Sequence, residues 1–87
     1  MSAGGDDPFE IWAVDIAPGE ERAVAPDEWA DALVLVKSGE LDVRCAEGGR
    51  RTFRTGDMLA LCWLRARNLA NVGAERVRLV AVRRSVR

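Results

Sequence analysis

The chain has 87 residues, of which 48% are hydrophobic and 31% are charged. This length fits one small domain with a single core, and the composition is typical of a folded soluble chain and excludes a disordered one. No apolar run approaches the roughly 18 residues that a membrane-spanning helix needs, and the N-terminal segment lacks the basic and apolar regions of a secretion signal. We therefore expect residues 1–8 to form a flexible tail, residues 9–87 to form one domain, and the protein to be cytoplasmic, with no membrane partner.

The net charge is −1, but acidic and basic residues are distributed unevenly along the chain. Residues 1–49 contain 12 acidic and 3 basic side chains, whereas residues 50–87 contain 2 acidic and 10 basic ones. If strands from the two halves are neighbours, these charges pair across strands; if the halves segregate, one basic face attracts an anionic partner. We favour the first arrangement. Because a net charge of −1 gives no overall attraction to a polyanion, we do not expect nucleic-acid binding.

The sequence contains two cysteines and no histidine. Cys45 and Cys62 each lie in an apolar segment typical of a strand, and in a cytosolic protein we expect two buried thiols. A disulfide between them requires that their strands be neighbours. The lack of histidine removes the commonest metal ligand and the commonest general base of enzymes.

Short apolar segments separated by glycine and proline residues recur along the chain. Phe9–Ile16 alternates apolar and polar side chains and predicts a strand. Residues 20–31 are mostly polar and are interrupted by Pro26, which predicts a loop or an edge strand. A helical turn around Asp27–Ala30 is the alternative, because proline is favoured at the start of a helix.

The apolar run Leu33–Val36 predicts a strand that is covered on both faces. Ser38-Gly39 follows, and Leu41–Cys45 then alternates apolar and polar residues, which together predict a β-hairpin. Because no helical period of useful length appears, six to eight short strands predict an all-β fold, either a small antiparallel barrel or a sandwich. The remaining strands are predicted over the ranges 51–54, 58–64, 67–72 and 76–83.

The order of these elements resembles the cupin superfamily, whose members are small antiparallel double-stranded β-helix barrels of the jelly-roll type. Pro18-Gly19 resembles the start of the family's first motif, and the strand that runs into Gly39 resembles its end. The second motif contains a glycine, a proline, a second glycine, a histidine and an asparagine. In this sequence these five positions hold Gly56, Cys62, Leu64, Arg67 and Asn71, in that order.

The resemblance covers roughly residues 9–84 and implies a cupin-like barrel of about eight strands. Asp57 after Gly56 fits the family's habit, and Val72-Gly73 with the strand that follows resembles its closing hairpin. The resemblance also implies a homodimer, since short barrels of this family are often dimeric. A buried contact between sheets suits the high apolar fraction of so small a chain.

The resemblance implies metal ligands at positions that this sequence fills with residues of other types. They fall on Ala25, Asp27, Asp31 or Ala32, and Arg67. A guanidinium does not bind metal ions, and one or two carboxylates without imidazole make a poor transition-metal site. We therefore expect neither a metal nor another cofactor, and we do not carry over the family's metal-dependent activities.

Four residues are the candidates for ligand binding: Asp27, Asp31, Trp63 and Arg67. Because the resemblance implies that these positions converge at the barrel mouth, an Arg67–aspartate pair could occupy the place of the metal or present a guanidinium to an anionic ligand. Alternatively, Arg67 faces solvent and the aspartates cap a turn. Trp63 lies within the second motif, so we expect its ring near the mouth, in a ligand pocket or in a core or dimer contact.

The leading hypothesis is a metal-free cupin-like module that binds a small molecule or a partner protein, with no evident catalytic residue. The second is a metal-independent cupin enzyme of the isomerase or epimerase type. Such enzymes normally use a histidine or tyrosine base, and this chain has neither. The third is a purely structural dimerisation module.

Overall fold

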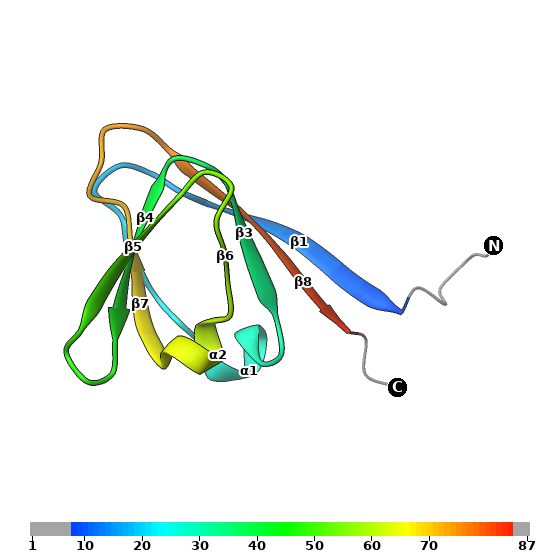
Figure 1. The fold of residues 1–87 in the computed structure, drawn as a ribbon. Coiled ribbons are helices and arrows are strands. Elements are labelled where there is room, and N and C mark those ends of the chain that lie inside the picture. Colours follow the sequence, from blue (N-terminus) through cyan, green and yellow to red (C-terminus); the bar gives the residue numbers. More distant parts are fainter. Residues whose placement is uncertain (1–7, 85–87) are drawn as a thin grey trace.

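Two four-stranded antiparallel sheets face each other in the computed structural model, which describes residues 8–84 (Figure 1). Sheet A has the strand order β1 (Phe9–Ile16), β8 (Val77–Arg84), β3 (Leu33–Ser38) and β6 (Met58–Leu59). Sheet B has the order β2 (Glu21–Ala23), β7 (Ala66–Ala70), β4 (Glu40–Cys45) and β5 (Arg50–Arg54). The prediction of an all-β barrel of about eight strands is confirmed.

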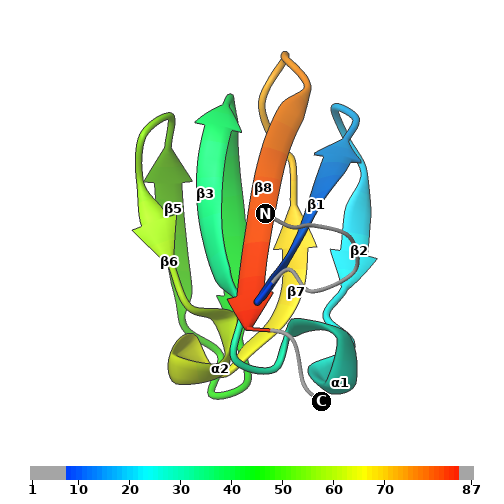
Figure 2. The same ribbon diagram turned by 90° about the vertical axis from the view of Figure 1, so that its right-hand side faces the viewer.

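Two one-turn helices, α1 (Pro26–Trp29) and α2 (Leu61–Leu64), lie together at one end of the barrel (Figures 1 and 2). The loops that join β3 to β4, β5 to β6 and β7 to β8 lie at the other end. Neither helix is long or apolar enough to cross a membrane, and the part of the chain that the structure describes has no other helix.

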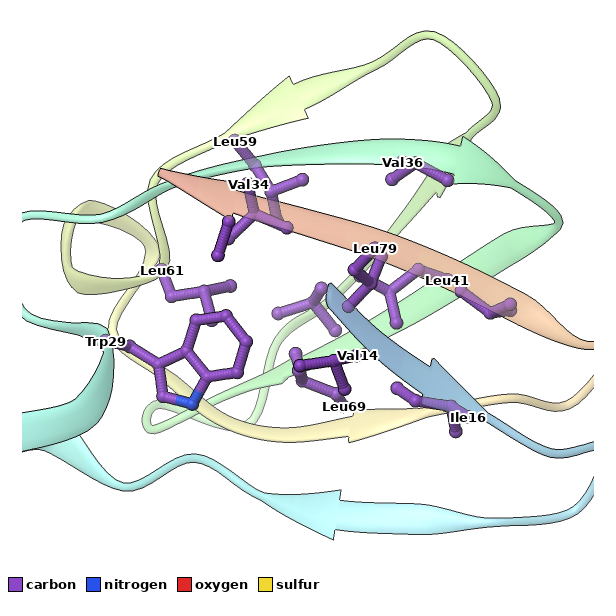
Figure 3. Packing of buried hydrophobic residues seen from close by; sticks show 13 residues of the cluster. Val14, Ile16, Trp29, Val34, Val36, Leu41, Leu59, Leu61, Leu69 and Leu79 are labelled. Atoms are coloured by element: carbon purple, nitrogen blue, oxygen red, sulfur yellow. The ribbon is translucent and has the colours of Figure 1, made fainter. Parts of the chain in front are cut away.

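The hydrophobic core lies between the two sheets and is built from alternate residues of their strands (Figure 3). Val77, Leu79 and Ala81 of β8 are fully buried on one side, and Leu41 and Val43 of β4 are fully buried on the other. This alternation is the two-residue period of a strand that turns one face to the core. Each large aliphatic side chain buried in this way contributes about 1.5–3 kcal/mol to folding.

The N-terminal elements agree with the sequence. β1 has the predicted bounds Phe9–Ile16, and the predicted edge strand is present as β2. The helical turn given as the alternative is also present, because α1 begins with Pro26 at its first position. The division into a tail of residues 1–8 and one domain of residues 9–87 stays a prediction, since residues 1–7 and 85–87 lie outside the described part.

Two predicted hairpins are wrong. β3 pairs with β8 and β6 in sheet A, whereas β4 pairs with β7 and β5 in sheet B. β7 and β8, the two strands of the expected closing hairpin, also belong to different sheets. A hairpin and a corner between facing sheets both bring the apolar faces of two strands to the same core. The alternation of apolar and polar residues therefore does not distinguish them. The hairpin at Gly48-Gly49, which joins β4 to β5, is present.

The predicted strand over residues 58–64 is also wrong beyond Leu59. The chain leaves β6 there and forms α2, in which the amide of Leu64 donates to the carbonyl oxygen of Ala60 at 3.2 Å. Leu61 and Leu64 are three residues apart and therefore share one face of the helix. Leu61 is buried, and Leu64 is half-buried against the core. A short apolar run fits a buried strand and a buried helical turn equally well. Cys62 therefore lies in a helix and not in a strand adjacent to Cys45.

The predicted pairing of charges between the two halves of the chain is confirmed. Six ion pairs join an acidic residue of positions 1–49 to an arginine of positions 50–87 in the described part of the chain. The best aligned joins Asp15 of β1 to Arg78 directly opposite on β8, with Nε–Oδ1 at 3.0 Å and Nη2–Oδ2 at 3.2 Å. These side-chain hydrogen bonds, together with the charges of Arg78 and Arg76, hold the pKa of Asp15 below its ordinary value of 3.8. Partial desolvation acts in the opposite direction but is outweighed.

We expect Arg78→Gln to raise the pKa of Asp15 toward its ordinary value, as followed by an NMR titration of the Asp15 carboxyl group. Because the pKa of Asp15 is lower in the folded state than in the unfolded state, the ion pair stabilises the fold at pH values above the unfolded-state pKa. That contribution is lost as the pH falls through the folded-state pKa. The effect on stability is small, since the pair is exposed. Arg54→Gln, which breaks the exposed pair with Glu40, is the control, and an unchanged Asp15 titration in Arg78→Gln contradicts the assignment.

Candidate functional site

A pocket of about 340 Å³ opens at the end of the barrel where α1 and α2 meet β7. We call it the mouth pocket. Most of its lining is aliphatic or aromatic, and two arginines stand among these groups. The lining residues are Val24, Trp29, Ala30, Ala46, Leu61, Arg65, Ala66 and Arg67. An apolar cavity of this size with a few polar groups is the usual form of a small-molecule site.

Trp29 forms a buried wall of the mouth pocket. Its side chain is buried and lies with Leu61 at one end of the core cluster (Figure 3). The Trp29 ring packs against the Trp12 ring of β1, with centroids 5.8 Å apart and planes tilted by 52°. The guanidinium carbon of Arg83 lies 5.2 Å from the centroid of the Trp12 ring on the same strand pair. The aromatic contact with Trp12, which itself has a cation–π contact with Arg83, holds the Trp29 indole in place.

Arg67 brings a positive charge to the pocket from β7. It lies on the same face of that strand as Leu69, which is fully buried, because alternate residues of a strand share a face. The carbonyl oxygen of Arg67 accepts a hydrogen bond from the amide of Val24 at 2.8 Å, which ties the end of β2 to β7. No side chain that the structure describes forms an ion pair with Arg67.

Arg65 supplies a second guanidinium at the same pocket and has an unusual backbone. Its φ angle is 54°, the left-handed conformation, immediately after α2. This conformation costs a non-glycine residue about 1–2 kcal/mol, and glycine adopts it without that cost. Nη1 of Arg65 lies 3.1 Å from Oε2 of Glu47, so this charge already has a partner. Arg67 is therefore the better candidate for an anionic ligand.

The structure separates Arg67 from the predicted aspartates. Asp27 and Asp31 line a different depression of about 230 Å³, together with Glu10 and Arg83. The backbone carbonyl of Asp27 accepts from Nη1 of Arg83 at 3.3 Å. No ion pair joins Arg67 to either aspartate among the described side chains, so the hypothesis of an Arg67–aspartate pair is not supported by the geometry.

Trp63 and Asp31 share a third depression of about 240 Å³, which also includes Leu33. The Trp63 side chain is 87% exposed on α2, so this ring is not part of the core. Its helix lies at the mouth end as expected, but its ring does not line the mouth pocket. Ligand binding by Asp27, Asp31 or Trp63 stays a prediction.

The residues present do not fit the metal that cupin barrels often hold. Arg67 stands where the resemblance in the second motif implies a histidine ligand, and it lines the mouth pocket, whereas the two aspartates line a separate depression. In residues 8–84 no group of three or more histidine, cysteine, aspartate or glutamate side chains is placed to bind a metal ion. The mouth pocket offers guanidinium groups and hydrocarbon, a donor set that suits an anion.

A wider depression of about 530 Å³ lies at the loop end of the barrel. Two of its charged residues, Glu40 and Arg54, pair with each other at 3.2 Å. Asn71, which also lines it, uses its side chain in hydrogen bonds to the backbone. Because its one arginine is already paired, this depression offers an anion no unpaired guanidinium, unlike the mouth pocket.

Sequence reasoning identified Arg67 but missed Arg65, Leu61 and Trp29 as pocket residues. Arg65 and Arg67 flank a single alanine, a spacing typical of neighbours on one strand face, but Arg65 precedes the strand. Leu61 was assigned to a strand that does not exist. Trp29 belongs to the helical turn around Asp27–Ala30, which the sequence offered only as an alternative. That turn, if accepted, would have placed the Trp29 ring at the mouth end of the barrel.

Three solved structures resemble this chain over most of its length. A Cupin 2 conserved barrel domain protein from Salinispora arenicola CNS-205 is 23% identical, with a TM-score of 0.72 over 94% of this chain and 68% of that one. The Cupin_2 domain of an XRE family transcriptional regulator from Enterobacter cloacae is 22% identical, with a TM-score of 0.73 over 92% and 84%. A protein from Neisseria meningitidis is 19% identical, with a TM-score of 0.66 over 90% and 75%.

The chain is therefore a cupin-fold barrel, as the resemblance in its turns implied. No family model matches the sequence, and no curated protein matches it.

Proposed function

We propose that this protein is a binding module that holds a small apolar anion in the mouth pocket. The observation that carries the proposal is the position of Arg67, a guanidinium without a described acidic partner beside an apolar cavity of about 340 Å³. A carboxylate would accept two hydrogen bonds from that guanidinium. The hydrocarbon part of the same ligand would pack on Trp29 and Leu61.

The volume limits the size of the ligand. A water molecule occupies about 30 Å³ in the liquid, so the pocket has room for roughly ten non-hydrogen atoms. A carboxylic acid with a short aliphatic chain or one aromatic ring has this size. Such a ligand matches both the charge and the apolar walls of the pocket.

The pocket favours binding over catalysis. Its described lining residues include no carboxylate, thiol, hydroxyl or imidazole group that could act as a general base. This argues against the alternative of a metal-independent isomerase or epimerase. The likeness to a domain of a transcriptional regulator supports a module that senses a ligand, in a cytoplasmic setting.

Octanoate is a suitable probe, and its neutral isostere octanamide tests the role of charge. We expect octanoate to shift the Trp29 indole N–H signal in NMR spectra and to bind more tightly than octanamide. Arg67→Gln should weaken octanoate binding by about 10- to 100-fold, the equivalent of one charge-assisted hydrogen bond of about 1.5–3 kcal/mol. Octanamide binding should change little in this variant.

Arg51→Gln is the matched control, because Arg51 is an exposed arginine that lines a different depression. It should leave octanoate affinity unchanged. Equal loss of affinity in the two variants would indicate a general effect of surface charge. Failure of octanoate to perturb Trp29 at all would contradict the proposal.

A further inference from the structure

A depression of about 450 Å³ lies between the β4–β5 hairpin and α2, and we call it the hairpin depression. Figure 1 shows the turn of this hairpin and α2 at the same end of the barrel. The hairpin supplies most of the lining, and α2 with the residue that follows it supplies the rest. The lining residues are Cys45, Glu47, Gly49, Arg50, Arg51, Trp63, Leu64 and Arg65.

Trp63 gives the hairpin depression a flat aromatic surface that is open to solvent. Its side chain is 87% exposed, the highest value among the large apolar residues of the described chain. Leu61 and Leu64 turn the other face of α2 to the core, so Trp63 points outward. An exposed indole beside positive charges is the kind of surface on which nucleobases stack.

Three guanidinium groups line the hairpin depression against a single carboxylate, so its lining has a net positive charge. That carboxylate, Glu47, accepts from Nη1 of Arg65 at 3.1 Å. Arg50 pairs with Asp42 at 3.4 Å, but the Asp42 side chain is only 2% exposed and does not line the depression. A phosphate monoester carries a charge of about −1.5 to −2 at pH 7. It therefore balances this lining better than one carboxylate would.

Arg51 is the arginine best placed to hold a phosphate. It lies directly opposite Val43, which is fully buried, so Arg51 shares the face of sheet B that turns toward the core. The side chain is nevertheless exposed, as β5 is the edge strand of its sheet. Within the described part of the chain, Arg51 forms no ion pair. A guanidinium in this state can donate two hydrogen bonds to one phosphate.

We propose that the hairpin depression binds a nucleoside 5′-monophosphate, with its base stacked on Trp63 and its phosphate held by Arg51 and Arg65. At about 30 Å³ for each non-hydrogen atom, the depression has room for roughly fifteen of them, which is about the size of a ribose phosphate. The base would then lie outside this volume, over the exposed indole. Cys45 and Leu64, both half-buried, would form an apolar floor beneath the sugar.

The hairpin depression is separate from the mouth pocket, although Arg65 borders both. The ion pair of Arg65 with Glu47 draws its guanidinium toward the hairpin, because Glu47 lines only the hairpin depression. A guanidinium has five N–H donors, so Arg65 can keep this pair and still donate to a phosphate. The proposal therefore does not depend on the function proposed for the mouth pocket.

The test uses AMP as the probe, with adenosine and ribose 5-phosphate as its two halves. We expect AMP to shift the indole N–H signal of Trp63 in NMR spectra and to leave that of Trp29 in place. AMP should also bind at least about 5-fold more tightly than either half, because stacking and phosphate contacts both contribute.

Two substitutions separate the contacts of the base from those of the phosphate, as followed by the NMR signals of the ligand. Trp63→Ala should weaken AMP binding by about 5- to 100-fold, the usual effect of removing one stacked aromatic ring, and should leave ribose 5-phosphate binding unchanged. Arg51→Gln should weaken AMP and ribose 5-phosphate binding by about 10-fold or more and leave adenosine binding unchanged. Both positions are exposed, so circular dichroism should show folded β-structure in each variant.

Arg67→Gln is the matched control, because it removes an arginine of the mouth pocket that does not line the hairpin depression. It should leave AMP affinity unchanged. Failure of AMP to shift Trp63, or equal binding of AMP and adenosine, would overturn the proposal. Phenyl phosphate that binds as tightly as AMP would also overturn it, in favour of a phosphorylated aromatic side chain. A 5′-phosphorylated oligonucleotide that binds more than about 10-fold more tightly than AMP would replace the free nucleotide with a nucleic-acid end.

Discussion

Replacing Asn71 with alanine should destabilise the barrel by about 2–4 kcal/mol, although this residue lies in a loop beyond β7. Its side chain is 1% exposed. The side-chain amide donates to the carbonyl oxygens of Ile16 at 2.9 Å and Glu75 at 2.7 Å, and Oδ1 accepts from the amide of Gly73 at 3.0 Å. Alanine would leave these groups unpaired, and each costs about 1–3 kcal/mol where water does not reach it.

That loss is large for a domain of this size. At about 0.05–0.15 kcal/mol per residue, the whole chain has a stability of roughly 4–13 kcal/mol. Urea unfolding followed by circular dichroism measures the change, and the midpoint should fall without a change in slope. A loss below about 0.5 kcal/mol, as for an ordinary surface substitution, would show that water replaces the side chain easily.

Asn71→Asp should be more harmful than Asn71→Ala at neutral pH, because a carboxylate would face two carbonyl oxygens with no proton to donate. Burial raises the pKa of such a carboxyl group, so the variant should regain stability as the pH falls and the group binds a proton. Asn68→Asp is the matched control on β7. Asn68 is half-buried and is paired in register with Arg44, so this variant should remain close to wild type.

The role of Asn71 also explains why part of the second motif could be recognised from sequence. Gly56 and Asn71 serve the backbone: Gly56 has a φ angle of 95°, and Asn71 closes the loop between the two sheets. Asp57 belongs to the same turn, where its Oδ2 accepts from the amide of Arg54 at 2.8 Å. These requirements are local to each turn, so the residue types that meet them can be recognised in the sequence. The fold was therefore predictable from turns, even though the ligand positions differ.

The path of the chain between sheets was not predictable in the same way. Whether β3 turns back on itself or crosses to sheet B depends on which distant strand it pairs with. Its partners on β8 lie 40–49 residues further along the chain. The one-turn helix α2 posed a similar difficulty, since its helical form follows from packing Leu61 into the core. Tertiary contacts decide such short apolar runs.

The candidate site also combines features that the sequence indicates with features that only tertiary contacts decide. Arg67 was selected from its place in the second motif, and it lines the mouth pocket; ligand binding by Arg67 stays a prediction. Asp31 lies two residues after the end of α1 with a φ angle of 61°, and it lines depressions away from Arg67. That left-handed turn was not visible in the sequence, because aspartate adopts it only when the neighbouring structure requires it. The prediction that Leu33–Val36 is covered on both faces is wrong for the single chain, because Leu33 is 51% exposed. Which faces of a strand are covered depends on distant elements of the fold.

The corner at Gly39 leads to a second large effect, which we expect from Gly39→Ala. Gly39 has a φ angle of 91°, at the point where the chain leaves sheet A for sheet B. A Cβ atom there would lie 2.8 Å from the carbonyl oxygen of Arg76 and 3.0 Å from the Cα atom of Val77. Both are backbone atoms that cannot move without displacing β8. We expect a loss of at least about 3 kcal/mol, the sum of backbone strain and steric conflict.

Gly48→Ala separates these two contributions. Gly48 also has a φ angle of 91°, but a Cβ atom added there would meet nothing within 4 Å. Its substitution should cost only the conformational strain, about 1–2 kcal/mol. The difference between the two variants in urea unfolding therefore measures the steric conflict at the corner alone. If both variants lose the same stability, β8 yields at Arg76 and Val77, and the crossing between the sheets does not depend on close backbone contact at Gly39.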